Sequence, residues 1–329
     1  MKLQVKFTPW MRDIKEAKTF RIPQNIVLQI LIYLGVFLLL QMAESAVMMP
    51  FLMPRLFDWA MNEINQNNGG SIAYDVMMDK INNMMMDPAN TTIMLFCTLA
   101  GTIVIFLYCR FVEGRKLRTI GMRKEHALPQ YLLGGFAAFS MVVGIACLTG
   151  GLHFEGYRGQ FGWGLLAVFC GFLLQGMSEE VTCRGFMMSS TLRHHNMWWA
   201  IGINSVLFAL MHAFNTGFSF LACINLILCG VMFSLYALRT GSLWGACAFH
   251  SIWNFAQGNF YGLPVSGIDS GDTIFSMSLT GSDLVNGGAF GLEGSIATTI
   301  VLLIWIAALL FVPNPFAKKQ AAPETETAA

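Results

Sequence analysis

Four residues that are costly to bury in lipid occur within hydrophobic stretches of this sequence: Glu179, His212, His250 and Asn254. An ionisable side chain inside a bilayer costs several kcal/mol, so it is a functional candidate by default. A carboxylate beside a histidine can hold a water molecule and accept its proton. A histidine and an asparagine one helical turn apart can donate hydrogen bonds to a developing oxyanion. The set therefore suits hydrolysis of an amide bond by direct attack of water.

The spacing of charged residues near position 180 gives the two adjacent carboxylates different roles. Glu180 and Arg184 are four residues apart, so on a helix they share a face and can form an ion pair. Glu179 lies about 100° around the same helix, on the face that also carries Gln175 and Cys183. We therefore interpret Glu180 and Arg184 as a structural ion pair and Glu179 as the candidate general base.

The four candidate residues are predicted to lie at compatible depths in a membrane. With a chain reversal near Asn196 and a rise of about 1.5 Å per residue, Glu179 and His212 each lie about 20–22 Å from that reversal. A later helix that starts on the same side places His250 about 14 Å and Asn254 about 20 Å deep. These depths permit one common site.

Two other chemistries remain open for the same residues. Glu179, His212 and His250 would make a three-ligand zinc site with one open position, so the cofactor is either none or Zn. The sequence has no HExxH motif that would favour the metal. Ser178 and Cys183 are possible nucleophiles, but neither has a clear base partner on its helix.

Three short motifs occur in order along the chain, each in a hydrophobic stretch. They are EExxxR at Glu179, Glu180 and Arg184, FxxxH at Phe208 and His212, and HxxxN at His250 and Asn254. These motifs resemble those of the CPBP intramembrane proteases, a family that includes the type II CAAX prenyl endopeptidases and bacteriocin-processing or self-immunity proteins. The resemblance covers residues 162–258.

The resemblance implies a role for each motif residue. Glu179 would activate water together with His212, while His250 and Asn254 would stabilise the oxyanion. It also implies a peptide or protein substrate, membrane-anchored or prenylated, within or beside the lipid bilayer. Family members are often described as metalloproteases, although a metal-free glutamate mechanism also fits these residues.

The composition predicts a membrane protein that holds these residues on helices. The chain has 55% hydrophobic and only 12% charged residues, whereas a soluble domain carries about 25% charged residues. Its net charge of +1 gives no reason to expect a nucleic-acid partner. We predict an all-α, polytopic helix bundle with about eight transmembrane helices. The candidate spans are 26–46, 92–112, 130–149, 162–182, 197–214, 218–238, 242–259 and 295–313.

The distribution of charge orients these spans. Basic residues concentrate in the N-terminal segment and in the links that follow the even-numbered spans, whereas 47–91 and 260–294 are acidic. Since positive charge favours the cytoplasmic side, both termini are predicted to be cytoplasmic, in a plasma membrane, with span 26–46 retained as an anchor. The predicted regions are a cytoplasmic basic segment (1–25), an N-terminal transmembrane region (26–149) with an outer loop (47–91), a catalytic core (162–258), a second outer loop (260–294), a last transmembrane helix (295–313) and a disordered tail (314–329).

Two functions other than proteolysis use the same kinds of residue. A proton-coupled transporter could use a buried glutamate and histidines, but paired repeats or broken helices typical of that class are not evident in the sequence. A non-catalytic immunity or scaffold protein of the same fold would be expected to lack at least one catalytic group, and here all are present.

Overall fold

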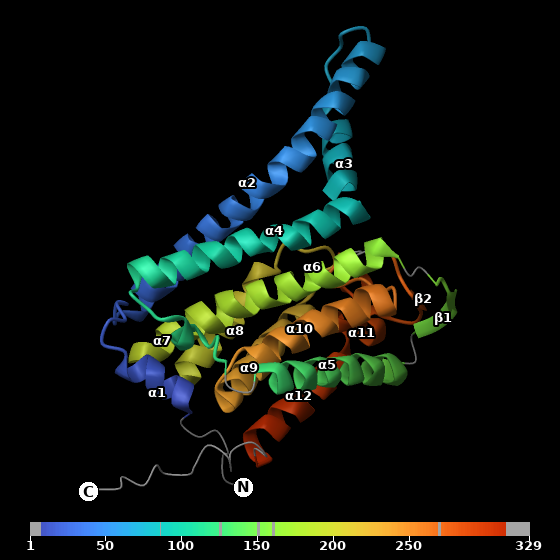
Figure 1. Ribbon diagram of the computed structural model, residues 1–329. Coiled ribbons are helices and arrows are strands. Elements are labelled where there is room, and N and C mark those ends of the chain that lie inside the picture. Colours follow the sequence, from blue (N-terminus) through green and yellow to red (C-terminus); the bar gives the residue numbers. More distant parts are fainter. Residues whose placement is uncertain are drawn as a thin grey trace, which may run out of the picture.

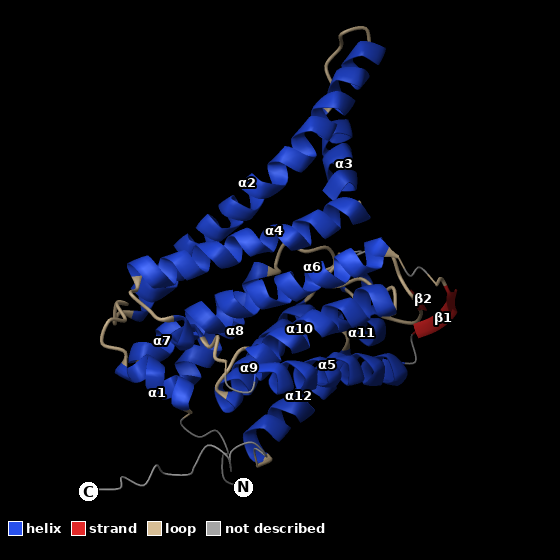
Figure 2. Cartoon of the chain, viewed as in Figure 1, coloured by secondary structure: helices blue, strands red, loops and turns tan. Residues whose placement is uncertain are grey.

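The structure is a computed structural model that describes residues 8–85, 87–124, 127–149, 152–159, 162–268 and 271–313. Its helices are α1 (Pro9–Glu16), α2 (Ile26–Gln66), α3 (Tyr74–Met85), α4 (Pro88–Leu107), α5 (Ala127–Thr149), α6 (Trp163–Glu180), α7 (Ser189–His194), α8 (Met197–Met211), α9 (Phe220–Thr240), α10 (Trp244–Phe255), α11 (Asp283–Asn286) and α12 (Ile296–Phe311). In the described part of the chain, strands occur as one antiparallel pair, β1 (Leu152–Tyr157) and β2 (Phe275–Leu279). The protein is therefore an all-α bundle with a small ribbon (Figure 2).

Each of the eight predicted hydrophobic spans coincides with a helix. Within the described residues, five helical stretches are long and apolar enough to cross a membrane: Ile26–Gln66, Pro88–Val112, Ala127–Ile145, Trp163–His194 and Phe220–Thr240. Two further apolar helices, α8 and α12, are shorter than a full span. The polytopic membrane bundle is thus confirmed, and the number of eight spans stays a prediction. The predicted tail at 314–329 lies outside the described residues.

Much of the predicted outer loop 47–91 is helical. α2 runs for 41 residues and so is about 60 Å long, twice the roughly 30 Å of a hydrocarbon core. It includes Pro50 and Pro54, which do not end it, and many strong helix formers extend it beyond the hydrophobic stretch. The distal part of α2 diverges from α4 and meets α3 (Figure 1), so that a helix lies within the predicted outer loop.

α10 is the central helix of the bundle and packs against α5 on one side and α6 on the other. Glycines allow these close approaches: Gly134 of α5 lies against the backbone of Gly245, and Gly176 of α6 lies against Ser251. Such small-residue contacts are typical of helices that associate in a membrane. α4 covers α6, and α8, α9 and α12 complete the other side. The packing fixes α6 and α10, the two helices that carry most of the candidate site.

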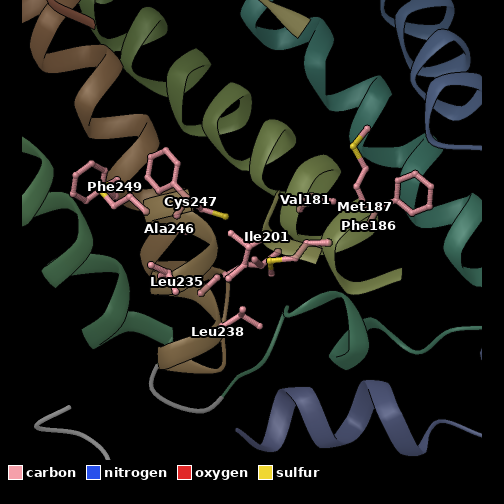
Figure 3. Close-up of a cluster of buried hydrophobic side chains, with 14 of the residues drawn as sticks. Val181, Phe186, Met187, Ile201, Leu235, Leu238, Ala246, Cys247 and Phe249 are labelled. Carbon is pink, nitrogen blue, oxygen red and sulfur yellow. The ribbon is translucent and has the colours of Figure 1, made fainter. Parts of the chain in front are cut away.

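Buried apolar side chains fill the space between these helices. Figure 3 shows part of this core, in which Phe186, Ile201, Leu235 and Phe249 come from four different segments of the chain. A buried side chain of this size contributes about 1.5–3 kcal/mol to folding relative to an exposed one. This core packs around the segment that runs from α6 to α7, next to the candidate polar site, and so helps to fix the position of that site.

The helix that begins as α6 continues to His194 through a π-helical segment, Val181–Met188. Buried Arg115, from the link after α4, supports this segment by donating hydrogen bonds to the Gly185 carbonyl (3.1 Å) and to Ser189 Oγ (2.5 Å). Arg115 also pairs with Glu113 at 3.0 Å. Burial raises the pKa of the Glu113 carboxyl, and the Arg115 charge opposes that shift. π-helical segments are frequent at functional sites, and this one directly follows Glu180.

The predicted second outer loop, 260–294, is also largely ordered. β2 pairs with β1 at the end of the bundle opposite α1 and α7 (Figure 1). A tight turn at Val265–Ile268 folds back toward the helices, and Ser266 in it adopts a positive φ of 47°. The Glu293 carboxylate holds this turn by accepting hydrogen bonds from the Ser266 N–H at 2.7 Å and from Gln257 at 3.2 Å. The loop therefore lies against the bundle interior.

Candidate active site

The structure brings together the four residues that the sequence singled out. Glu179 lies in the last turn of α6, His212 directly follows the end of α8, and His250 and Asn254 lie on one face of α10. α8 begins with an Asn196 cap, as the predicted chain reversal requires, and it ends at Met211, so that His212 lies beside Glu179.

One oxygen of Glu179 faces both histidines. Its Oε2 lies 3.9 Å from His212 Nε2 and 3.7 Å from His250 Nε2. This oxygen is buried and accepts no hydrogen bond from the described residues. The other oxygen, Oε1, accepts a short hydrogen bond from the Gln175 side-chain amide. Glu179 is thus held on one side and presents an unpaired acceptor to the imidazoles.

Hydrogen bonds fix which nitrogen each imidazole turns toward Glu179. His212 Nδ1 donates to the Phe208 carbonyl at 2.9 Å, and His250 Nδ1 donates to Glu180 Oε1 at 3.0 Å. Because a carbonyl and a carboxylate only accept, each Nδ1 carries the proton and each Nε2 is left for chemistry. The FxxxH motif residue Phe208 therefore contributes its backbone oxygen as well as its ring.

The predicted contact between Glu180 and Arg184 is present, with 2.8 Å between Oε1 and the guanidinium and both side chains fully buried. The Arg184 guanidinium also lies over the rings of Phe208 (4.6 Å) and Phe233 (5.1 Å). The same Glu180 oxygen accepts from His250, a contact between α6 and α10 that spacing along one helix does not reveal. Glu180 thus connects its ion pair with Arg184 to His250, the candidate hydrogen-bond donor to the oxyanion.

Gln175 is a site residue that the sequence did not single out. It accepts a hydrogen bond from Asn254 Nδ2 at 3.0 Å and donates to Glu179. Its position four residues before Glu179, on the same helical face, was the available signal. The chain from Asn254 through Gln175 to Glu179 joins the EExxxR and HxxxN motifs.

Two cavities meet at Glu179. The first is also lined by His250, Asn254 and Glu293. The second reaches Glu44 of α2. Both cavities are lined by His212 and Gln175 as well as Glu179. Glu293 is the other carboxyl among the described residues on the first cavity. Burial raises its pKa, and the hydrogen bonds that it accepts from Ser266 and Gln257 oppose that shift. The candidate base therefore lines both cavities.

The residues proposed as zinc ligands do not form a metal site in the described part of the chain, where no three His, Cys, Asp or Glu side chains are grouped with ligand geometry. Ligands of one tetrahedral zinc at about 2.0–2.1 Å lie about 3.3 Å from one another. The two carboxylate–imidazole separations, 3.9 and 3.7 Å, exceed this spacing. We therefore derive no step through a metal.

Comparison with known proteins supports the resemblance seen in the motifs. Residues 161–256 match the sequence model of a protein family described as Rce1-like, type II CAAX prenyl endopeptidase. The match covers less than a third of the chain, and it contains all three motifs. No curated protein and no solved structure matches the chain. At the level of the family, the match supports an intramembrane endopeptidase similar to CAAX proteases.

Proposed function

We propose that this chain is an intramembrane endopeptidase that hydrolyses a peptide bond with water activated by Glu179 and His212. The observation that carries this proposal is the unpaired, buried Oε2 of Glu179, which faces two imidazole nitrogens at 3.7 and 3.9 Å. The family match of residues 161–256 supports the same activity.

The separation of Glu179 and His212 suits a shared water molecule. A water about 2.8 Å from both the carboxylate oxygen and the imidazole Nε2 spans a gap of 3.9 Å with an ordinary angle. Glu179 then accepts the proton as the water oxygen attacks the substrate carbonyl. His212 orients the water by accepting its other hydrogen, because its Nδ1 donates to the Phe208 carbonyl.

His250 and Asn254 are the proposed donors to the oxyanion that forms in this attack. His250 donates from Nε2 when it is an imidazolium, a state that the Glu180 carboxylate on Nδ1 stabilises. Asn254 uses one amide hydrogen for Gln175 and has the second for the oxyanion. With His250 charged, two positive and two negative groups balance in the buried cluster, since Arg184 offsets Glu180 and His250 offsets Glu179.

Collapse of the tetrahedral intermediate requires a proton on the leaving amine. Glu179 has just accepted a proton and lies within the cavity, so it can return that proton to the amine nitrogen. The products at this stage are a carboxylic acid and a neutral amine, and Glu179 ends in its ionised starting state. Transfer of the acid's proton to the amine then gives a carboxylate and an ammonium group. Neither Ser178 nor Cys183 is needed as a nucleophile.

The surrounding regions define where this reaction takes place. We propose that 162–258 is the catalytic core, that both termini are cytoplasmic, and that 47–91 and 260–294 lie on the outer side of a plasma membrane. The substrate is a peptide or protein within or anchored to the bilayer, because the cavities lie among apolar helices. A prenylated substrate is compatible with the family match.

Cleavage profiling of membranes tests the proposed function. Membranes that contain the wild-type chain should yield new peptide termini that are absent from membranes containing the Glu179→Gln chain at the same level. Identical profiles for the two would contradict the proposal. A proton flux in liposomes that is lost in Glu179→Gln, together with identical profiles, would instead favour a transporter.

A further inference from the structure

The second cavity contains a carboxylate that the proposed mechanism does not use, Glu44 of α2. We propose that Glu44 binds a basic side chain of the substrate and so selects peptides with Lys or Arg close to the scissile bond. This inference rests on the proposed peptidase function. It concerns a helix that precedes the family match at 161–256 and is therefore a property of this chain beyond the matched segment.

The residues that line the two cavities place Glu44 along the path of a bound peptide. His250 and Asn254 line the first cavity, Glu44 lines the second, and Glu179 and His212 line both. A peptide whose carbonyl oxygen lies beside His250 and Asn254 and whose carbonyl carbon faces Glu179 has one flank pointing into the second cavity. Residues on that flank, a short distance from the scissile bond, reach Glu44.

Contacts between α2 and α4 hold the Glu44 carboxylate at this cavity. Its Oε1 lies directly against Gly101 of α4, where a Cβ atom would have no room. Leu40, one turn earlier on α2, lies against the same glycine. Because Gly101 lacks a side chain, the carboxylate can approach α4 closely and border the cavity.

The charge of Glu44 has no counterpart among the described residues. Neither an ion pair nor a hydrogen bond joins its carboxylate to another described group. Of the described side chains on this cavity, the other acidic or basic ones are Glu179 and His212. Since Arg184 and His250 already offset Glu180 and Glu179, Glu44 when ionised adds a negative charge to the site that no described group offsets.

A cationic side chain is the ligand that removes this excess. An unpaired charge in a poorly hydrated place costs several kcal/mol, and an opposite charge from the substrate offsets that cost. The rest of the cavity suits the aliphatic stem of Lys or Arg, because Phe37, Leu40 and Met94 line it. A neutral or acidic side chain would leave the Glu44 charge unmatched.

Peptide affinity and cleavage together test this inference in the full chain reconstituted in liposomes. Three single-span peptides are used that differ only in carrying Lys, Gln or Glu beside the scissile bond. Affinity is measured by fluorescence in the wild-type chain, with forms of these peptides in which a non-cleavable bond replaces the scissile amide. The Lys peptide should bind at least about tenfold more tightly than the Gln peptide. Glu44→Gln should bring this ratio close to one, and Glu44→Lys should favour the Glu peptide.

Two controls separate binding from a structural role. Glu63→Gln is the same chemical change on α2 outside both cavities and should leave the preference intact. Glu44→Gln should not lower the melting temperature, because the carboxylate has no described partner to lose. Equal affinity for all three peptides, or an equal loss for all three in Glu44→Gln, would overturn the inference.

The same experiments distinguish failure of the proposed peptidase function from failure of the Glu44 inference. If the wild-type chain binds the Lys peptide with the predicted preference but cleaves it no faster than Glu179→Gln does, the peptidase function fails while the Glu44 site stands. If the wild-type chain cleaves all three peptides with the same kcat/KM, the function stands and the Glu44 inference fails.

Discussion

Replacement of Glu180 by Gln should affect stability and activity together. Glu180 and Arg184 are both fully buried and 2.8 Å apart, so Glu180→Gln leaves an uncompensated guanidinium in the bundle. Breaking a buried ion pair by removing one partner costs about 3–5 kcal/mol. The cation–π contacts of Arg184 with Phe208 and Phe233 remain and do not replace the lost charge. We expect a free energy of unfolding in detergent that is lower by about this amount.

The same substitution should lower activity through His250. The amide introduced by Glu180→Gln would still be able to accept a hydrogen bond from Nδ1, but it would no longer stabilise an imidazolium. Loss of a carboxylate that orients and stabilises a catalytic histidine reduces kcat by up to about 10⁴-fold. We expect kcat for peptide cleavage to fall by at least about 10²-fold, with a smaller change in KM.

The double variant Glu180→Gln/Arg184→Met separates the two effects. Removing the unpaired charge should restore part of the stability, because a buried ion pair can be replaced by apolar groups at little cost. It should not restore activity, since His250 still lacks its carboxylate. Glu16→Gln, the same change at an exposed position of α1, should alter neither quantity. An active and stable Glu180→Gln protein would refute the role assigned to this cluster.

Three further predictions concern topology, metal and the oxyanion donors. Cysteine labelling at Asp75 and Asp272 should occur from the outer side; labelling from the cytoplasm would contradict the eight-span topology. Purified active protein should lack stoichiometric zinc and keep its activity in a chelator, whereas activity lost on chelation and restored by zinc would show a metalloenzyme. Asn254→Ala should reduce kcat about 10²–10³-fold at nearly unchanged KM, and an unchanged kcat would exclude Asn254 as a donor.

Hydrophobic length was sufficient to predict where most helices lie, because a membrane helix must satisfy its own backbone hydrogen bonds. It did not predict the end of α2, since that helix continues to Gln66, well past position 46, in a sequence that is less hydrophobic but still favours helix. Nor did it predict the fold of 260–294. That link is held by Glu293 and Ser266, which are distant in sequence and meet only in the tertiary structure.

The site could be predicted in part because helical spacing is a local property. The pairing of Glu180 with Arg184 followed from four-residue spacing alone. The contact of Glu180 with His250 and the contact of Glu179 with His212 join different helices, whose order around the bundle is not encoded in spacing. Motif resemblance supplied that missing information for the matched segment, and it supplied none for Glu44.

The central claim is that Glu179 activates water for peptide hydrolysis. Its most direct test is the single-turnover rate of peptide cleavage by purified, reconstituted wild-type and Glu179→Gln protein, with melting temperatures measured on the same samples. Gln keeps the size and hydrogen bonding of Glu179 but cannot accept the proton, so the account predicts a rate lower by at least about 10²-fold at an unchanged melting temperature. A near-wild-type rate from folded Glu179→Gln protein would contradict it.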